Sequence, residues 1–153
     1  QPSQTLIQWF HQQQVILNRE AITMLVYRVE HPYHAKGPYH TRYQSDKIYK
    51  VLKDMAEKHS DSKHPNWYDD NLPSNSIRLK AGFSNRKQLL WWFKGYFKIL
   101  HKCGFKIVIY EIDKGFVNSG HSRKQINFYY LYANKKEVLR IPEFLMQLKG
   151  VNF

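Results

Sequence analysis

The stretch SNRKQLLWWFKGYFKILHKCGFKIVIYEI, residues 84–112, decides the expected fold, because a helical pattern turns directly into a strand pattern within it. Apolar residues at three- and four-residue steps predict a helix over residues 85–102, capped by Ser84, with a buried face made of Leu89, Phe93, Phe97 and Leu100. Gly104 stands where a glycine commonly ends a helix. Residues 105–112 are rich in β-branched side chains and predict a strand.

Weaker patterns on either side of this stretch complete an α+β fold. Upstream they predict helices over residues 4–19 and 45–58 and strands over 23–30 and 77–83. Downstream they predict a strand over 125–132 and a final helix over 142–149 that Pro142 opens. The element order αβαβαββα predicts a mixed sheet of about four strands with helices packed on it. We expect residues 1–22 to form a helical arm and residues 23–153 to form a single core domain.

Composition is typical of a folded protein in a reducing compartment. The chain has 153 residues, of which 42% are hydrophobic and 16% aromatic, enough to bury one core. Its single cysteine, Cys103, excludes an intrachain disulfide and a zinc finger. No apolar run approaches the roughly 20 residues that a membrane-spanning helix needs, and the first ten residues lack the pattern of a signal peptide. A cytoplasmic location is therefore expected.

The whole chain has a net charge of +12, and the positive charge is concentrated in its second half. Residues 1–77 hold 9 Lys or Arg and 8 Asp or Glu, a balance of +1, and residues 78–153 hold 15 and 4, a balance of +11. Such asymmetry favours a nucleic acid, an anionic membrane or an acidic protein as partner. A lysine-rich solvated surface without a partner is the alternative interpretation.

The outward side of the predicted helix over residues 85–102 carries the clearest binding pattern. Residues at three- and four-residue steps line up opposite its apolar face, namely Lys87, Trp91, Lys94, Lys98 and Lys102. Arg86 adds a charge at the first turn, and Arg123 and Lys124 precede the next predicted strand. The lysines would contact phosphates while Trp91 stacks on a base. A solvated lysine face with Trp91 packed against a neighbouring element stays open.

Metal-dependent and nucleophilic chemistry find little support in the residue patterns, and no metal is predicted. Five histidines lie in two polar loops without the spacing of a familiar metal site, namely His31, His34, His40, His59 and His64. Asp69 and Asp70 fit a turn better than a magnesium site. Cys103 ends a predicted helix, where the helix dipole disfavours a thiolate. The glycine-rich loops that hold nucleotide phosphates and the GxSxG nucleophile elbow are absent.

Five segments spread over about residues 24–140 resemble a family of small bacteriophage and prophage proteins. The segments are VYRVE (26–30), GPY (37–39), HPNWYDD (64–70), GFSNRKQLLWWF (82–93) and GFKIVIYEI (104–112). This resemblance implies a host-takeover or anti-defence setting and no particular activity.

A more remote resemblance is to ADP-ribosyltransferases, and it implies a different function. Those folds often place an Arg on a first strand, a Ser after an aromatic residue on a middle strand and a Glu on a late strand. Arg28, Ser84 and Gln125 stand at the matching positions here, with Glu111 as a substitute for the missing carboxylate. Arg28 would then hold the diphosphate of NAD, and its alternative role is a strand arginine paired with Glu30. The likeness is one of fold and does not by itself establish activity.

Three functional hypotheses follow from the sequence. The first is a basic phage-type accessory protein that binds nucleic acid or a host nucleoprotein through the Lys/Trp helix face, without a cofactor. The second is an ADP-ribosyltransferase-like enzyme that uses NAD. The third is a protein–protein inhibitor of a host enzyme, which would cover an acidic patch with the basic face or the N-terminal helix.

Overall fold

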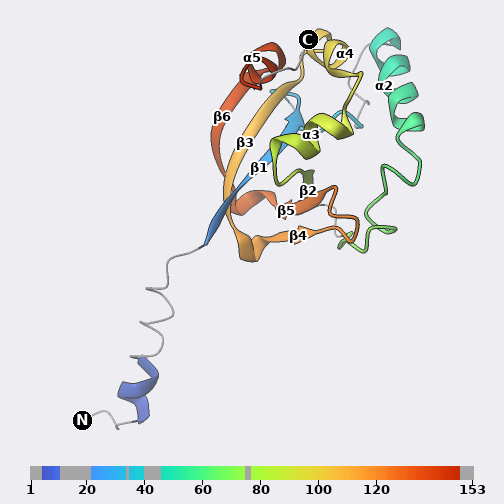
Figure 1. Ribbon diagram of the computed structural model, residues 1–153. Helices are drawn as coiled ribbons and strands as arrows, with labels where there is room; N and C mark the ends of the chain where they lie inside the picture. The colour runs from blue at the N-terminus through green and yellow to red at the C-terminus, as the bar shows by residue number, and fades with distance from the viewer. Residues whose placement is uncertain (1–4, 11–21, 34, 40–45, 75–76, 149–153) are drawn as a thin grey trace.

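The computed structural model of the protein describes residues 5–10, 22–33, 35–39, 46–74 and 77–148 (Figure 1). Helices and antiparallel strands share this part of the chain, so the predicted α+β class is confirmed. The strands form two three-stranded sheets instead of the single mixed sheet of about four strands that the sequence predicts.

The first sheet has the order β1-β3-β6, with β3 (Lys106–Asp113) between β1 (Thr23–Glu30) and β6 (Asn134–Arg140). Both pairings are antiparallel, and the register of β3 with β6 shifts between Ile109 and Tyr110. β1 has the bounds that its β-branched and aromatic residues predict.

The second sheet has the order β2-β5-β4 and consists of β2 (Leu79–Gly82), β5 (Ile126–Tyr129) and β4 (Val117–Ser119). It meets the first sheet at Tyr27 and Phe83, whose backbone N–H groups each donate to the other's carbonyl at 2.8 Å. The two sheets therefore continue one another in the order β4-β5-β2-β1-β3-β6. A Cβ at Gly82 would come within 2.6 Å of the side chain of Val26, so this junction requires glycine.

β4 and β6 are strands that the sequence pattern does not predict. β6 reads NKKEVLR, and all its side chains are exposed except that of Leu139, because it forms one edge of the first sheet. An edge strand with this many charges lacks the apolar alternation that reveals a strand. The strand predicted over residues 125–132 is shorter in the structure, because a 3₁₀ turn over Tyr130–Tyr132 follows β5. The strand predicted over residues 77–83 is likewise reduced to β2.

The single helix predicted over residues 85–102 is wrong, because two short helices occupy this segment. α3 (Arg86–Trp92) ends before α4 (Phe97–Lys102) begins, and Gly95 between them has a φ of +87° that breaks the helix. The cap is also one residue later than predicted, since the side chain of Asn85 accepts from the backbone N–H of Gln88. Gly104 follows α4 with a φ of +90°, as predicted.

The remaining helices lie near their predicted positions. α2 (Asp46–Lys58) contributes the buried side chains of Leu52 and Met55, and α5 (Ile141–Met146) carries Pro142 in its first turn. A 3₁₀ turn over Lys114–Phe116 joins β3 to β4. Residues 5–10 are helical, and the rest of the predicted N-terminal helix, like His34, His40 and Ser45, lies outside the described residues. No described helix is long and apolar enough to cross a membrane.

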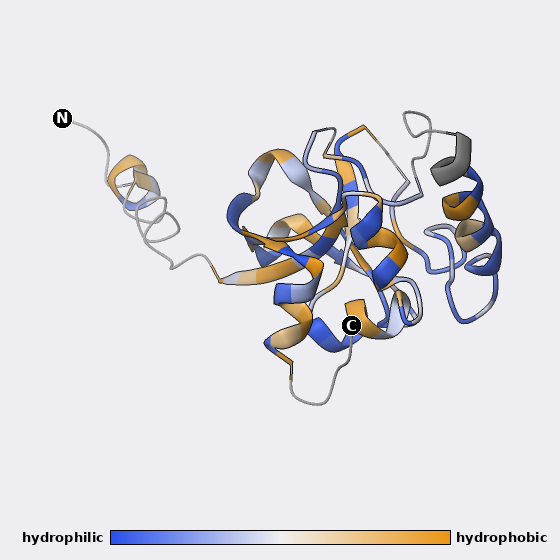
Figure 2. Cartoon of the chain, turned by 90° about the horizontal axis from the view of Figure 1, so that it is seen from above, coloured by the Kyte–Doolittle hydropathy of each residue, from blue (hydrophilic) through white to orange (hydrophobic). Residues whose placement is uncertain are grey.

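The first sheet separates two hydrophobic clusters. Tyr27 and Val29 of β1 face a cluster shared with α2, α3, α4 and α5, whereas Val26 faces a smaller cluster with Tyr110 and Phe128. This alternation follows the two-residue period of a strand. In Figure 2 the hydrophobic residues are concentrated in the strands and the adjoining helices. Arg28 shares a face with Val26, so the fold buries a charged side chain beside the smaller cluster.

Candidate functional site

A cavity of about 1380 Å³ lies among the described residues, and β1, β2 and the loop after α2 contribute to its lining. Segments far apart in the sequence meet there: residues 28–29, 35–39, 56–70, 79–83, 92–93 and 121–125. Small-molecule sites are typically cavities of about 300–1,000 Å³ with a few placed polar groups, so this one accommodates a ligand as large as a dinucleotide.

Arg28 is a buried cation in the lining of this cavity, with 6% of its surface exposed. Its Nε donates to Glu30 Oε2 at 2.9 Å, its Nη1 to the Ala81 carbonyl at 2.7 Å, and its Nη2 to the Ala35 carbonyl at 3.3 Å. Burial lowers the pKa of Arg28, and the carboxylate of Glu30 opposes that shift. A guanidinium has five N–H bonds, so two of them have no acceptor among the described residues.

Glu30 is buried behind Arg28 and is held from two sides. Besides the ion pair with Arg28, its two carboxylate oxygens accept from the Tyr110 hydroxyl at 2.8 and 2.9 Å. Burial raises the pKa of Tyr110, so its hydroxyl keeps its proton and donates. These contacts fix the guanidinium of Arg28 in one orientation.

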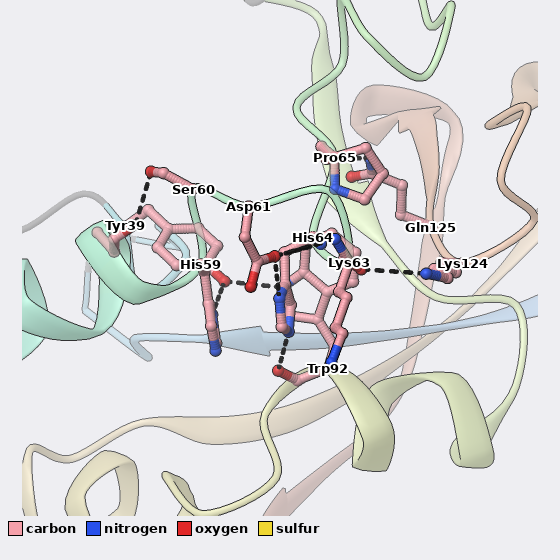
Figure 3. Close-up of polar contacts among 11 residues, drawn as sticks. Tyr39, His59, Ser60, Asp61, Lys63, His64, Pro65, Trp92, Lys124 and Gln125 are labelled. Atoms are coloured by element: carbon pink, nitrogen blue, oxygen red, sulfur yellow. Dashed lines mark hydrogen bonds and ion pairs between the residues drawn. The ribbon is translucent and has the colours of Figure 1, made fainter.

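A hydrogen-bond chain runs along one side of the cavity (Figure 3). Trp92 Nε1 donates to the Tyr39 hydroxyl at 2.7 Å, and that hydroxyl lies 2.6 Å from His59 Nδ1. The indole can only donate, so the Tyr39 oxygen accepts from it, and in the Nε2–H tautomer of neutral His59 the Tyr39 hydroxyl donates to Nδ1. Burial lowers the pKa of His59 to about 4, and the neighbouring His64 contributes to the shift. His59 is therefore neutral at pH 7, and its Nε2 carries the proton.

Three rings form a stack at the rim of the cavity. His64 lies between His59, at a centroid distance of 4.0 Å, and Trp91, at 5.0 Å. The Nζ of Lys124 lies 4.8 Å from the centre of the Trp91 ring. His64 Nδ1 lies 2.9 Å from Asp61 Oδ1, and its Nε2 lies 3.2 Å from the Trp92 carbonyl (Figure 3). Trp91 therefore packs against a neighbouring element, although 41% of it stays exposed.

Gln125 also lines the cavity, from the turn before β5. Its amide nitrogen donates to the Pro65 carbonyl at 2.6 Å and to Asp70 Oδ2 at 3.0 Å, and its amide oxygen accepts from none of the residues that the structure describes. Asp70 is 1% exposed and also accepts from the backbone N–H and the hydroxyl of Ser122. Asp70 therefore ties the loop after α2 to the turn that presents Gln125.

Two of the four residues implied by the transferase resemblance lie in the cavity and two do not. Arg28 and Gln125 line it. The Ser84 hydroxyl instead donates to Gln88 Oε1 at 2.9 Å, outside the lining. Glu111 lies on β3 opposite Leu25 and faces Lys136 at 3.9 Å, so the structure does not bring it to Gln125.

The residues of the predicted polyanion-binding face are divided by the break at Gly95. Four lysines are exposed on α3, on α4 and between them, namely Lys87, Lys94, Lys98 and Lys102. Arg123 is exposed in the turn beside Lys124, with a φ of +60°. Arg86 is withdrawn from this face, because its guanidinium lies over the rings of Tyr27 and Phe144 and donates to Gln147.

The described residues contain no group of three His, Cys, Asp or Glu side chains arranged to hold a metal ion. Burial raises the pKa of Cys103, which favours its thiol form. The candidate site is therefore built from nitrogen donors and aromatic rings.

The family model of the bacteriophage T4 Y00F protein matches residues 24–142. The chain belongs to the bacteriophage T4 Y00F protein family. The match includes every residue that lines the cavity, so the cavity lies within the part of the chain that this Y00F-family protein shares with the family model. Membership confirms the predicted likeness to phage proteins and places the chain among phage accessory proteins. No curated protein and no solved structure matches the chain.

Several cavity residues of this Y00F-family protein escape sequence reasoning. Lys80, Trp92 and Asp70 acquire their roles only through contacts with distant segments. Two segments quoted for the phage resemblance, GPY over 37–39 and HPNWYDD over 64–70, do line much of the cavity. The presence of these two segments in the phage resemblance is the sequence signal that could have drawn attention to the cavity residues within them.

Proposed function

We propose that this Y00F-family protein is an ADP-ribosyltransferase-like enzyme that binds NAD in the cavity. The observation that carries the proposal is the buried Arg28, whose guanidinium has two unused N–H bonds in a cavity that Gln125 also lines. A buried guanidinium held by a carboxylate is suited to hold a diphosphate through paired, charge-assisted hydrogen bonds. No glycine-rich loop is needed when a side chain does this.

The aromatic and polar groups of the cavity suit the two ends of NAD. Tyr39 and His59 offer ring surfaces to a base, and the Nε2–H of neutral His59 is a donor. The oxygen of Gln125 is an acceptor for a ribose hydroxyl, because its amide nitrogen is occupied by Pro65 and Asp70. In the proposed reaction the bond between ribose C1′ and nicotinamide breaks, and a bond from C1′ to an acceptor nucleophile forms as that nucleophile loses its proton.

The neutral Gln125 limits the rate that this arrangement supports. A carboxylate at this position would stabilise the cationic ribose that develops as nicotinamide leaves, and an amide oxygen supplies only a partial charge. The negative charge of Asp70 lies one hydrogen bond behind Gln125, on the Nε2 side. We therefore expect transfer that is slow, with NAD binding easier to detect than turnover.

Transfer of label from NAD tests the activity. The protein is incubated with NAD carrying a label on the adenosine and with lysate of a bacterial host, and labelled macromolecules are counted. We expect labelling with the wild type and no labelling with Arg28→Lys. Arg140→Lys makes the same chemical change at an exposed position, and this control should label as the wild type does. If the wild type neither transfers label nor binds NAD, the proposal is overturned.

Nucleic-acid binding is the second candidate, and the exposed lysines around α3 and α4 support it. Lys94 and Lys98 face solvent on the charged half of the chain, where they would contact phosphates without reading bases. The packing of Trp91 between His64 and Lys124 reduces the ring surface left for stacking. A host-takeover or anti-defence role fits either candidate.

A salt series tests this second candidate. Binding to labelled single- and double-stranded DNA and RNA should weaken with a log–log slope near −0.7 to −0.9 per neutralised phosphate, and Lys94→Glu/Lys98→Glu should abolish it. Salt-insensitive binding would contradict it. Capture of a host protein that survives nuclease treatment would instead favour the third candidate, a protein–protein inhibitor.

A further inference from the structure

Two cations share one acceptor at the floor of the cavity. The carbonyl oxygen of Ala35 accepts from Lys80 Nζ at 2.7 Å and from Arg28 Nη2 at 3.3 Å. Ala35 has a φ of +50°, a conformation that is uncommon for a residue with a Cβ and that tends to occur at ligand clamps. The loop over 35–39 thus holds an ammonium and a guanidinium side by side in the cavity lining.

Both cations keep donors that the surrounding protein does not use. Two N–H bonds of Arg28 lack an acceptor among the described residues. Lys80 has three N–H bonds, and one of them donates to the Ala35 carbonyl. Its ammonium also lies 3.7 Å from the centre of the Tyr130 ring. At least one further Lys80 donor is therefore available to a ligand.

The local charge is unbalanced. Glu30 is the carboxylate whose charge acts on Lys80, and Arg28, Tyr110 and Lys135 already contact it. No carboxylate of the described residues forms an ion pair with Lys80 itself. The charged groups that act on Lys80 are two from β1, one from the loop after it and one from β6, namely Arg28, Glu30, Lys36 and Lys135. Arg28 and Lys135 share the single carboxylate of Glu30, which leaves an excess of positive charge around Lys80 that an anion would neutralise.

We propose that Lys80 and Arg28 form a two-cation clamp for the diphosphate of a nucleotide, with Lys80 binding the phosphate that Arg28 does not reach. This deepens the proposed function, on which it rests for the identity of NAD as the ligand. Neighbouring phosphates of a diphosphate offer several anionic oxygens, so one guanidinium and one ammonium can each take one. A single carboxylate ligand would leave the second cation without a partner.

The clamp makes anion affinity depend on pH. Burial, followed by the charge of Arg28, lowers the pKa of Lys80 to about 8. A bound diphosphate favours the charged ammonium and so raises this pKa in the complex. Affinity is therefore full below about pH 8 and falls as pH rises through the pKa of the free protein, by up to about tenfold per pH unit until the pKa of the complex is reached.

Calorimetry between about pH 7 and pH 9.5 tests the clamp, because the disubstituted diphosphates of NAD and ADP-ribose keep their charge throughout this range. We expect both ligands to bind the wild type about tenfold or more weakly at the upper pH. Lys80→Arg should remove most of this fall, because a guanidinium stays charged. Lys80→Gln should bind about tenfold more weakly at pH 7 and show no fall. Lys136→Gln, an exposed lysine outside the cavity, should match the wild type.

The outcomes separate the clamp from the proposed enzyme. If NAD binds with the same affinity at both pH values and Lys80→Gln does not weaken it, the clamp is wrong and the enzyme proposal stands. If NAD does not bind but ADP-ribose binds with a fall that Lys80→Arg removes, the clamp stands and the use of NAD is wrong. If neither ligand binds to the folded wild type at about pH 7, the clamp is wrong as well.

Discussion

Arg28 and Gln125 line the same cavity, although one lies on β1 and the other in the turn before β5. The junction of the two sheets at Tyr27 and Phe83 brings β1 beside β2, and β2 pairs with β5. The strand order, together with the anchoring of Gln125 by Asp70, therefore brings both residues into the lining of one cavity. This relationship underlies the proposal of NAD binding.

Replacing Glu30 by Gln should destabilise the protein strongly. The change leaves the buried guanidinium of Arg28 without its countercharge, and breaking one side of a buried ion pair typically costs about 3–5 kcal/mol. Urea unfolding measures the loss. Glu137→Gln makes the same chemical change on an exposed residue and should leave the free energy of unfolding nearly unchanged. Equal stabilities for the two variants would mean that Glu30 does not balance Arg28.

Asp70→Asn should loosen the turn that presents Gln125. The carboxylate accepts three hydrogen bonds, from the backbone and side chain of Ser122 and from Gln125, and an amide nitrogen would face a donor in at least one of them. We expect a loss of roughly 1–3 kcal/mol in the free energy of unfolding, together with weaker NAD binding. Its neighbour Asp69 is exposed, so Asp69→Asn serves as the control for stability. A fully stable Asp70→Asn protein would argue against this anchoring role.

The depressed pKa of His59 predicts a loss of stability in mild acid. Its pKa is about 4 in the folded protein and 6.5 without the surrounding structure, so between these values the unfolded chain binds a proton that the folded chain does not. The free energy of unfolding should therefore fall as pH drops from about 6.5 toward 4. Unfolding by urea at a series of pH values measures the slope.

His59→Gln should flatten that slope, because it removes the titrating ring while leaving an acceptor for the Tyr39 hydroxyl. His121→Gln replaces an exposed histidine and should keep the slope of the wild type. Hydrogen bonds from His64 lower the pKa of the Asp61 carboxyl from its ordinary 3.8, so the stability that Asp61 adds is lost mainly below about pH 4, under the range in which His59 titrates. Identical slopes for His59→Gln and the wild type would show that His59 is not held neutral.

The sequence predicts the elements whose residues are buried on a regular period. β1 and β3 are recognisable because their β-branched residues are buried, and Leu89, Phe93 and Leu100 keep helical spacing across residues 89–100. The same spacing conceals the break at Gly95, because it continues through the turn between α3 and α4. β6 is invisible for the opposite reason, since its charged side chains lie on an exposed edge.

The candidate site is only partly predictable. Arg28 and Gln125 can be identified by resemblance to a fold, and the pairing of Arg28 with Glu30 by their positions two apart on a strand. The shared acceptor Ala35 and the bond from Trp92 to Tyr39 depend on how loops cross the two sheets. No local pattern reports such contacts, because the partners lie more than 40 positions apart.

The most direct test of the NAD-binding cavity is calorimetric titration of NAD into the wild type, Arg28→Lys and Arg140→Lys, after circular dichroism has confirmed that each protein is folded. Arg28→Lys keeps the charge but loses the paired donors, so we predict binding about tenfold or more weaker than the wild type, a change of at least about 1.4 kcal/mol. Arg140→Lys should bind as the wild type does, because its side chain is exposed on β6. Equal affinity of folded Arg28→Lys and the wild type, or no binding by the wild type, would contradict the assignment of the cavity.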